Sequence, residues 1–347
     1  MYLARLFTAR TLIAGLALLL LLPYGLGAAS GRQSLAVDRP ASIVVTTTPL
    51  PLNRDDPGQT RIGALDYRGG LLLRSTAKGF GGVSGLASDG AGQFLAVTDT
   101  GNWFAFRTRE RGGRLVGLGE AALAPILGLD GQSAPTKSDG DAEALHWDAA
   151  SGAASIVYEQ DHRIVHVKGL TPDRLDAPAT REERWAGMAD WRSNGGGESL
   201  AHVPLADGRT ARLIIAEDAV TDDGHNLALL EIDGTVRRIR IPAIAEHRPT
   251  DAEWLDGTRL LLLHRRFNQK GPGAALTLVD LAPALAGDTP AASTTLAAWE
   301  APVVLDNMEG ITITRVGGET FVYLISDDNL NSLQQTVLLK FALLLPE

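Results

Sequence analysis

The chain has 347 residues, of which 45% are apolar and 21% charged, and its formal net charge is −9. A chain of this length can bury a large core, and its acidity argues against nonspecific nucleic-acid binding, which needs a basic face. It contains no cysteine, which excludes disulfides, thiolate metal sites and a cysteine nucleophile.

The first residues have the pattern of a secretory signal. Arg5 and Arg10 precede an apolar run over 11–22, and small residues follow at 27–29. We therefore expect residues 1–29 to be a signal peptide, and the mature protein to be periplasmic or secreted with no membrane contact after cleavage. The alternative is an uncleaved N-terminal anchor, because residues 12–29 approach the ~20 apolar residues that span a bilayer. Residues 30–60, rich in Thr, Pro and Asp, are expected to form a flexible lead-in.

A short phrase recurs five times further along the chain. It reads GGVSGLA, DGDAEALH, NGGGESLAH, RPTDAEWL and LDNMEGITI. Aligned on one polar anchor, the phrases follow one another at steps of 59, 55, 55 and 56 residues, a period that indicates a repeat architecture. The anchors are Ser84, Glu143, Glu198, Glu253 and Glu309.

Short apolar runs separated by Gly, Asp, Asn and Pro fill each unit, which predicts four β-strands joined by turns. Such groups of four strands are typical of the blades of a β-propeller. The expected strands of the first four units are 83–87, 93–98, 103–108 and 114–118; 144–147, 154–159, 164–167 and 180–185; 199–203, 212–217, 227–232 and 235–241; and 252–255, 259–264, 275–281 and 294–299.

The fifth unit has three expected strands, at 310–314, 321–326 and 336–343, and lacks a fourth. Residues 61–73 precede the first unit and have no blade of their own, so their pairing with the last unit would close the ring and remove its exposed edges. Leu345 lies 280 positions after Leu65, a separation equal to five periods of 56. We therefore predict an all-β propeller over residues 61–347 with five four-stranded blades, and six blades as the alternative.

Two layers of acidic residues are expected at one mouth of this propeller. The anchors form the first layer, and the acids that follow the second strand of a unit form the other, at Asp99, Glu159, Glu217 and Asp327. Clustered carboxylates repel one another unless a cation intervenes, and hard oxygen ligands suit Ca²⁺. The predicted calcium ligands are Asp139, Asp141, Glu143, Glu198, Glu253, Glu309, Asp327 and Asp328. The alternative is that the glutamates only accept hydrogen bonds from a neighbouring blade, a role that would also recur in every repeat.

The fourth unit departs from this pattern, because His264, Arg265 and Arg266 stand where other units have an acid. Arginine binds phosphate or carboxylate with two parallel hydrogen bonds. Strand alternation allows only one of the two arginines to face the acids, and its alternative role is an ion pair with the acid of a neighbouring blade. His264 beside them is the candidate general base, and these three residues are the predicted catalytic residues.

Several strings of the sequence resemble the phytase-like family described as "esterase-like activity of phytase". They are GGVSGLASDGAGQFLAVTDTG, DAEALHWD, GGGESLA, LLLLHRRF, LDNMEGIT and LISDDNLNSLQQTVLLKF, and together they run from Ile62 to Leu343. This family comprises β-propellers likened to calcium-dependent phytases, so the resemblance implies a hydrolase of a small-molecule ester or phosphoester. With only five lysines, the chain is poorly suited to phytate itself, which favours a smaller ester.

Two functions are therefore expected from different classes. One is a hydrolase in which calcium assists the attack of water at the propeller mouth. The other is a non-catalytic propeller that binds a ligand or a partner and uses calcium for structure, because the fold alone does not separate the two. Both leave the oligomeric state open.

Overall fold

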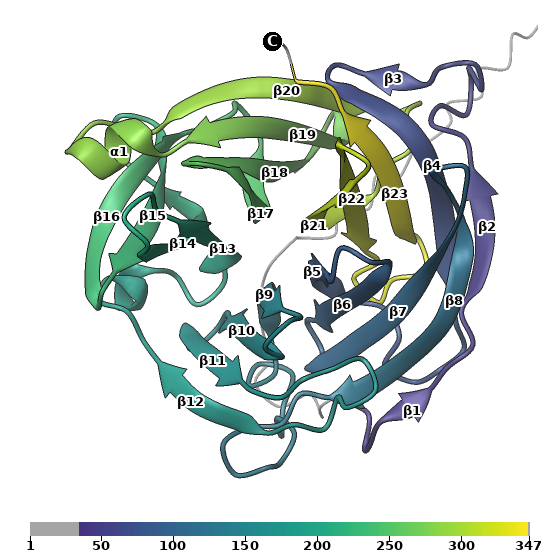
Figure 1. The fold of residues 1–347 in the computed structure, drawn as a ribbon, viewed down its shortest axis with the longest axis horizontal. Helices are drawn as coiled ribbons and strands as arrows, with labels where there is room; N and C mark the ends of the chain where they lie inside the picture. Colours follow the sequence, from purple (N-terminus) through teal and green to yellow (C-terminus); the bar gives the residue numbers. More distant parts are fainter. Residues whose placement is uncertain (1–34, 346–347) are drawn as a thin grey trace, which may run out of the picture. The chain divides into compact units, whose positions relative to one another are not determined.

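The computed structural model describes residues 35–345, which form a five-bladed β-propeller (Figure 1). Each blade is an antiparallel sheet of four strands, and the innermost strands of neighbouring blades contact one another around the ring. The predicted all-β fold with five blades is confirmed, and the alternative with six is excluded. The expected signal peptide, residues 1–29, lies outside the described residues.

The strands follow the chain from the centre of each blade outward in the first four blades. Blade 1 contains β5 (Val83–Ser88), β6 (Gln93–Thr98), β7 (Asn102–Arg111) and β8 (Arg114–Pro125). Blade 2 contains β9 (Ala142–Asp148), β10 (Ala153–Tyr158), β11 (Arg163–Val167) and β12 (Ala179–Glu183). Blade 3 contains β13 (Gly197–Pro204), β14 (Thr210–Val220), β15 (His225–Ile232) and β16 (Thr235–Pro242). Blade 4 contains β17 (Arg248–Asp256), β18 (Arg259–Asn268), β19 (Gly271–Asp280) and β20 (Ala292–Glu300).

Blade 5 closes the ring with strands from both ends of the domain. It contains β21 (Asn307–Val316), β22 (Glu319–Asp327), β23 (Thr336–Leu343) and β4 (Leu65–Arg74). β4 pairs antiparallel with β23, from Leu65 opposite Leu343 to Leu73 opposite Thr336. The predicted closure is therefore present, and it leaves no exposed edge between the first and last parts of the propeller.

Residues expected in a flexible lead-in contribute strands to the outer edges of two blades. β1 (Ala41–Ser42) pairs with β8, and β2 (Thr46–Leu50) pairs with β4. A third short strand, β3 (Arg61–Ile62), also pairs with β4. Pro49 lies within β2, where an outermost strand tolerates the loss of one N–H donor.

Local sequence explains why the strands reverse where they do. Asp233 and Gly234 join β15 to β16 with φ of 52° and 81°, the left-handed pair that a two-residue hairpin requires. The blades pack face to face through apolar side chains, as where Leu95 and Trp103 of blade 1 meet Ile156 of blade 2. Two short helices, η1 (Met188–Asp190) and α1 (Ala282–Ala286), lie in connections. Within residues 35–345, no helix is long and apolar enough to cross a membrane.

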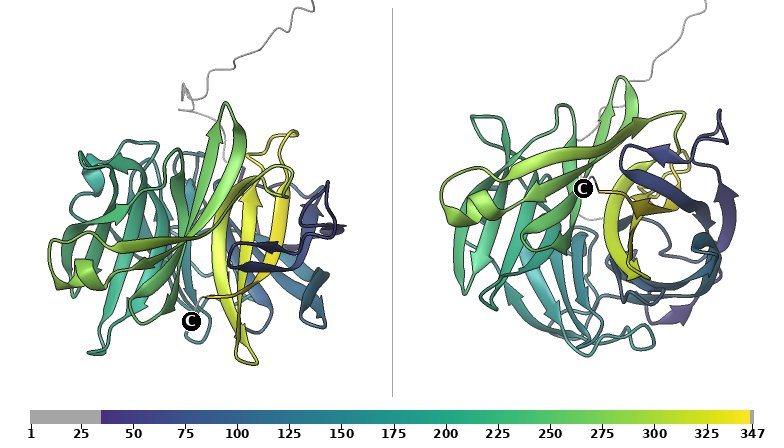
Figure 2. Two further views of the ribbon diagram at one scale, coloured as in Figure 1. Left: turned by 90° about the horizontal axis from the view of Figure 1, so that it is seen from above. Right: turned by 45° about the horizontal axis from the view of Figure 1, so that its top comes forward.

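The inner strands begin, and the second strands end, at one end of the ring, which we call the upper end. β6 and β10 end just before Asp99 and Glu159, while β5 and β9 begin close to those residues. The views in Figure 2 show the connections of the blades gathered at the two ends of the ring. The acids predicted from the repeats therefore meet at the upper end, around the centre of the ring.

Candidate functional site

A β-bulge at the start of every inner strand positions the first layer of the site. In each blade one residue has no partner across the ladder, because the register between the first and second strands shifts there. A bulge turns the extra side chain away from the sheet and is common next to functional sites. The five bulged residues are Ser84, Glu143, Glu198, Thr250 and Glu309.

In blade 4 the bulged residue is Thr250 and not the expected anchor Glu253. The hydroxyl of Thr250 donates to the carbonyl of Met308 on blade 5 at 3.0 Å, as Ser84 donates to the carbonyl of Ala142 on blade 2 at 2.5 Å. Each hydroxyl thus binds the residue just before the bulge of the next blade. The ring at the channel therefore has three carboxylates and two hydroxyls, in place of the predicted four carboxylates and one hydroxyl.

The two acids that follow Thr250 join blade 4 to blade 5. Asp251 is fully buried and accepts from the amide of Ile311 at 2.8 Å, and Glu253 accepts from the hydroxyl of Thr312 at 3.2 Å. Burial raises the pKa of Glu253 to about 7, although Thr312 and the amide of Trp254 oppose the rise. Glu253 therefore has the alternative role considered from the sequence, because it accepts a hydrogen bond from a neighbouring blade. It lies apart from the carboxylates of the channel.

The second layer lies at or near the end of the second strand of each blade. The amides of Asp99, Glu159 and Glu217 donate to the carbonyls of Gly82, Asp141 and Gly196, each two residues before a bulge, at 2.8, 2.9 and 2.8 Å. Arg265 and Asp327 face the corresponding residues of blades 4 and 5. Blade 4 therefore supplies a cation where the other four blades supply an acid.

Arg265 neutralises one side of the channel. Burial alone would lower its pKa, but Glu309 and Glu217 outweigh burial and raise the pKa above its ordinary value. Arg265 thus has the alternative role predicted from the sequence, an ion pair with acids of neighbouring blades. Its guanidinium lies 2.5 Å from Glu217 Oε1 on blade 3, 2.8 Å from Asn307 Oδ1 and 3.3 Å from Glu309 Oε1 on blade 5.

The other two residues predicted to be catalytic lie away from the channel. His264 is fully buried inside blade 4, with Nε2 3.0 Å from Thr277 Oγ1, and burial lowers its pKa to about 3. Arg266 points to the opposite face from Arg265 and pairs with Glu300 at 2.6 Å. Strand alternation thus selects Arg265, and a histidine held neutral within a blade is not placed to exchange protons with a substrate in the channel.

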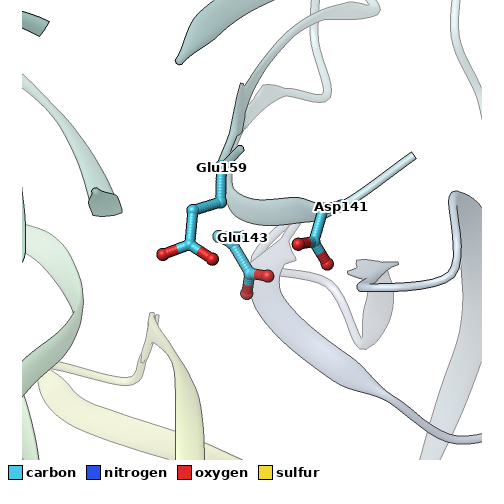
Figure 3. A group of neighbouring side chains, drawn as sticks. All are labelled: Asp141, Glu143 and Glu159. Atoms are coloured by element: carbon cyan, nitrogen blue, oxygen red, sulfur yellow. The ribbon is translucent and has the colours of Figure 1, made fainter. Parts of the chain in front are cut away.

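On the opposite side, three carboxylates of blade 2 converge (Figure 3). Asp141, Glu143 and Glu159 each offer an oxygen, and these oxygens lie within 4.8 Å of one another. Two ligands on opposite sides of Ca²⁺ are about 4.8 Å apart at a bond length of ~2.4 Å, so one divalent cation can contact all three residues. The all-oxygen donors of these residues suit a hard divalent cation such as Ca²⁺ or Mg²⁺.

Existing hydrogen bonds orient two of these carboxylates and leave the third available. Glu159 Oε1 accepts from the amides of Gly195 and Gly196, which leaves Oε2 for a ligand. Asp141 accepts from Lys137 at 2.8 Å and from Gln160 at 3.1 Å. The carboxylate of Glu143 receives no hydrogen bond from any residue of the described range 35–345.

Glu143 is also the site of electrostatic repulsion between neighbouring carboxylates. Burial raises the pKa of Glu143 well above its ordinary value, and the carboxylates of Glu198, Asp141 and Glu159 raise it further. Burial also raises the pKa of Glu198, to which Glu217, Glu159 and Glu309 add. Glu198 and Glu309 belong to blades that are not neighbours, so their interaction shows that the glutamates face one another across the channel. A divalent cation beside Glu143 would relieve this repulsion.

Lys137 is a contributor that the repeats did not reveal. It belongs to the long connection between blades 1 and 2, and its ammonium group bridges Asp99 at 3.0 Å and Asp141 at 2.8 Å. Burial lowers the pKa of Lys137, but these two carboxylates outweigh burial and leave it raised. The sequence signal was its position four residues before Asp141, within the run 137–141 that carries two acids.

The remaining predicted ligands are placed as follows. Asp139 is exposed and accepts from Thr136 Oγ1 at 2.6 Å, outside the three-carboxylate group. Asp327 is buried and accepts from the amide of Asn329, and its pKa is raised by burial and by Asp99. Asp328 accepts from the amides of Gly82 and Leu330 and from Thr336 Oγ1, each at 3.0 Å. Of the eight predicted ligands, Asp141 and Glu143 are the two that meet in one group.

The fold and the site define a five-bladed propeller with a cluster of mostly buried acidic residues around its centre, near its upper end. The family model for "Phytase-like: Esterase-like activity of phytase" matches residues 78–330, and the chain belongs to this family. The predicted resemblance is confirmed over these residues. No curated protein matches the chain.

Among solved structures the chain has distant likenesses to several proteins. An endo-arabinase from Bacteroides thetaiotaomicron matches with a TM-score of 0.46 and 10% identity, over 77% of this chain and 95% of that one. A GH62 α-L-arabinofuranosidase catalytic domain from Coprinopsis cinerea matches with a TM-score of 0.42 and 14% identity, over 86% and 97%. An aldose sugar dehydrogenase from Streptomyces coelicolor matches with a TM-score of 0.40 and 13% identity, over 79% and 98%. No functional conclusion follows from likenesses this distant.

Proposed function

We propose that the protein is a calcium-assisted hydrolase of a small ester or phosphoester, with its reaction centre at the upper end of the channel. The observation that carries the proposal is the group formed by Asp141, Glu143 and Glu159. Their oxygens are close enough together to share one divalent cation, and Glu143 has no hydrogen-bond donor within residues 35–345 to balance its charge. When bound there, calcium supplies a positive charge that polarises the ester oxygen and lowers the pKa of a water molecule.

Arg248 is the arginine placed to hold the anionic oxygen of a substrate. Its side chain is 54% exposed, and it shares Glu217 at 3.4 Å and Asp218 at 3.1 Å. A half-exposed guanidinium can turn from these carboxylates to a substrate, whereas Arg265 is held by acids of two neighbouring blades. We therefore assign substrate orientation to Arg248, and the positioning of Glu217 and Glu309 to Arg265.

Glu198 is the candidate for proton transfer. It is buried, its carboxylate receives no hydrogen bond from the described part of the chain, and it lies between Glu143 and Thr250 in the ring. A carboxyl group with a raised pKa can take a proton from an attacking water and return it to the leaving group near neutral pH. Lys137 holds Asp141 in place during this exchange.

A turnover assay tests the proposal. Purified protein without residues 1–29 is assayed on p-nitrophenyl phosphate and p-nitrophenyl acetate, with Ca²⁺ and with a chelator. We expect chelator-sensitive turnover that falls by on the order of 100-fold in Glu143→Gln, since a lost ligand weakens the cation site. Glu253→Gln is the matched control, because its carboxylate faces blade 5 and should leave turnover within twofold of wild type.

The second candidate is a non-catalytic propeller that uses calcium for structure. It is favoured by Asp251 and Ser84, because the polar groups of two inner strands serve to join neighbouring blades. In that case Ca²⁺ raises the melting temperature and Glu143→Gln abolishes the rise, while neither ester is hydrolysed. If calcium changes neither turnover nor melting temperature, both candidates are wrong.

Export of the protein remains a proposal that rests on residues 1–29. Their charged start, apolar run and small residues are typical of a cleaved signal. N-terminal sequencing of the protein recovered from a bacterial periplasmic fraction tests it. We expect a new terminus near Ser30, whereas an intact Met1 in the membrane fraction would support the anchor.

A further inference from the structure

A groove lies beside the acidic channel at the upper end of blade 5. Its volume is about 750 Å³, and its walls come from residues 44–46, 72–80 and 328–336. Asp328 lines the groove, follows Asp327 of the second layer, and accepts from the amide of Gly82, whose carbonyl binds the amide of Asp99. The groove and the channel thus share the connection between β4 and β5 as a common wall.

The chemistry of this groove differs from that of the channel. Its only charged residues are Arg74 and Asp328. Both oxygens of Asp328 are already occupied by hydrogen bonds from its own loop, Gly82 and Thr336, so this carboxylate is not free to hold a metal ion. Groups that both donate and accept hydrogen bonds make up most of the remaining wall. They include Ser75, Thr76, Asn331, Ser332, Gln334 and Gln335.

Phe80 and Leu330 are two of the five apolar residues in the wall. Phe80 is half-buried and packs edge-on against Phe104, with ring centroids 5.4 Å apart and planes at 86°. This contact fixes the orientation of the Phe80 ring and leaves part of its surface to the groove. Leu330 is the second, and 43% of its surface is exposed. A few apolar surfaces among convergent polar groups are typical of a small-molecule site.

The loop that presents Leu330 is held in a strained conformation. Asn329 and Leu330 have φ of 47° and 50°, a left-handed conformation that costs a residue such as leucine about 1–2 kcal/mol. Asp328 fixes it, because its carboxylate accepts from the amide of Leu330 and its carbonyl accepts from the amide of Asn331 at 2.8 Å. Gly81 makes room for the loop, since a Cβ there would lie 2.7 Å from Asp328 Oδ1.

Strain of this kind is retained where the surrounding structure enforces it, and it concentrates at ligand sites. In this loop the strain places a leucine in contact with solvent at the wall of a groove, where burial of the side chain gives no compensation in the free protein. A ligand that covers Leu330 and Phe80 would provide that compensation.

We propose that this groove binds a carbohydrate. A sugar ring offers hydroxyl groups that match the hydroxyl and amide side chains, and C–H faces that match Phe80 and Leu330. It carries no positive charge that would need a free carboxylate. Arg74, whose guanidinium makes no ion pair with any residue from 35 to 345, is available to a ring hydroxyl or to a uronic acid. In combination with the proposed function, on which this last step rests, the substrate is an ester carried by a saccharide.

Binding to a printed array of neutral and uronate-bearing oligosaccharides tests the groove. The protein without residues 1–29 is applied in the presence of a chelator, so that binding is measured without calcium and without turnover. Ser332→Trp and Thr76→Trp fill the groove from two exposed positions, and Leu333→Trp is the matched control. Leu333 is 87% exposed in the same loop but does not line the groove.

We expect a subset of the oligosaccharides to bind, with affinity reduced at least tenfold in both groove variants and unchanged in Leu333→Trp. Absence of binding to every oligosaccharide, or equal binding by Ser332→Trp and wild type, would overturn the proposal. Saccharide binding by a protein that hydrolyses no ester would refute the hydrolase alone. Hydrolysis of p-nitrophenyl phosphate without saccharide binding would refute the groove alone.

Discussion

Blades 2 and 4 have the same strand arrangement, but they present side chains of opposite charge at corresponding positions. Blade 2 directs Asp141, Glu143 and Glu159 toward one point and leaves Glu143 without a donor in the described chain. Blade 4 directs Thr250 and Arg265 to the corresponding positions and turns its own acids toward blade 5. The same backbone geometry thus supplies a place for a cation on one side and an internal cation on the other.

The repeated backbone geometry thus determines where the side chains point, whereas the residue type at each position differs from blade to blade. Because Arg265 already balances Glu217 and Glu309, a bound cation is needed only at blade 2. The comparison therefore predicts large effects when the internal cation of blade 4 is removed, and calcium-dependent effects only at blade 2.

The largest effect is expected from Arg265→Leu. The substitution leaves the buried Glu309 without its counter-charge and leaves Glu217 with only Arg248, and removing one partner of a buried ion pair costs about 3–5 kcal/mol. Urea unfolding should show this loss of stability. Arg266→Leu is the control one residue away, because its partner Glu300 is 61% exposed and such pairs contribute about 1 kcal/mol or less. Equal losses in the two variants would contradict the comparison.

The next effect concerns calcium at blade 2. A ligand that binds only the folded state stabilises it by about 2.7 kcal/mol at a concentration of 100 times its Kd. We expect such a gain for the wild type in a calcium titration followed by thermal unfolding, and no gain for Glu143→Gln. Thr250→Val, the change at the equivalent position of blade 4, should retain the calcium effect.

The sequence predicted the ring better than it predicted the ligands, and blade 4 shows why. The run Thr250-Asp251-Ala252-Glu253 offers three polar residues, and an alignment on the carboxylate chose Glu253. The bulge, however, lies at Thr250, and Asp251 takes the place held by the small residues Gly85, Ala144, Ser199 and Gly310 in the other blades. A requirement for a small residue after the anchor would have rejected Glu253, which precedes Trp254. It would have selected Asp251 and not Thr250, because Ala252 is the small residue of this run.

Lys137 illustrates what lay beyond a repeat-based prediction. It comes from a connection that no other blade shares, and its role depends on how that connection folds over Asp99 and Asp141. The second layer, in contrast, follows from strand alternation. Only one of the neighbouring residues Arg265 and Arg266 can face the channel, and it is Arg265. Periodic features thus followed from the sequence, while the balance of charge depended on single, non-repeated side chains.

The pH dependence of stability tests the role of Glu253, the anchoring acid of blade 4. The pKa of Glu253 is about 7 in the folded protein, above the ordinary 4.5, so the folded state holds its proton more tightly than the unfolded chain. Its contribution is full below pH 4.5 and is lost as the pH rises through 7, with a magnitude on the order of 2 kcal/mol. Glu253→Gln should lose less stability than wild type between pH 5 and 8 in urea unfolding. Parallel pH profiles for the two proteins would contradict this assignment.

The smallest effect tests whether Ser84 and Thr250 have one role in different blades. Each hydroxyl donates to the carbonyl that precedes the next bulge, so Ser84→Ala and Thr250→Val should each cost about 1 kcal/mol, the usual contribution of one hydrogen bond. Because blades 1 and 4 are not neighbours, the two losses should add in the double variant. Turnover of p-nitrophenyl phosphate should stay within twofold of wild type in both single variants, since neither hydroxyl touches the group formed by Asp141, Glu143 and Glu159. A tenfold loss of turnover with unchanged stability in Ser84→Ala would instead place the reaction centre at blade 1, and the contrast between blades 2 and 4 would no longer locate it.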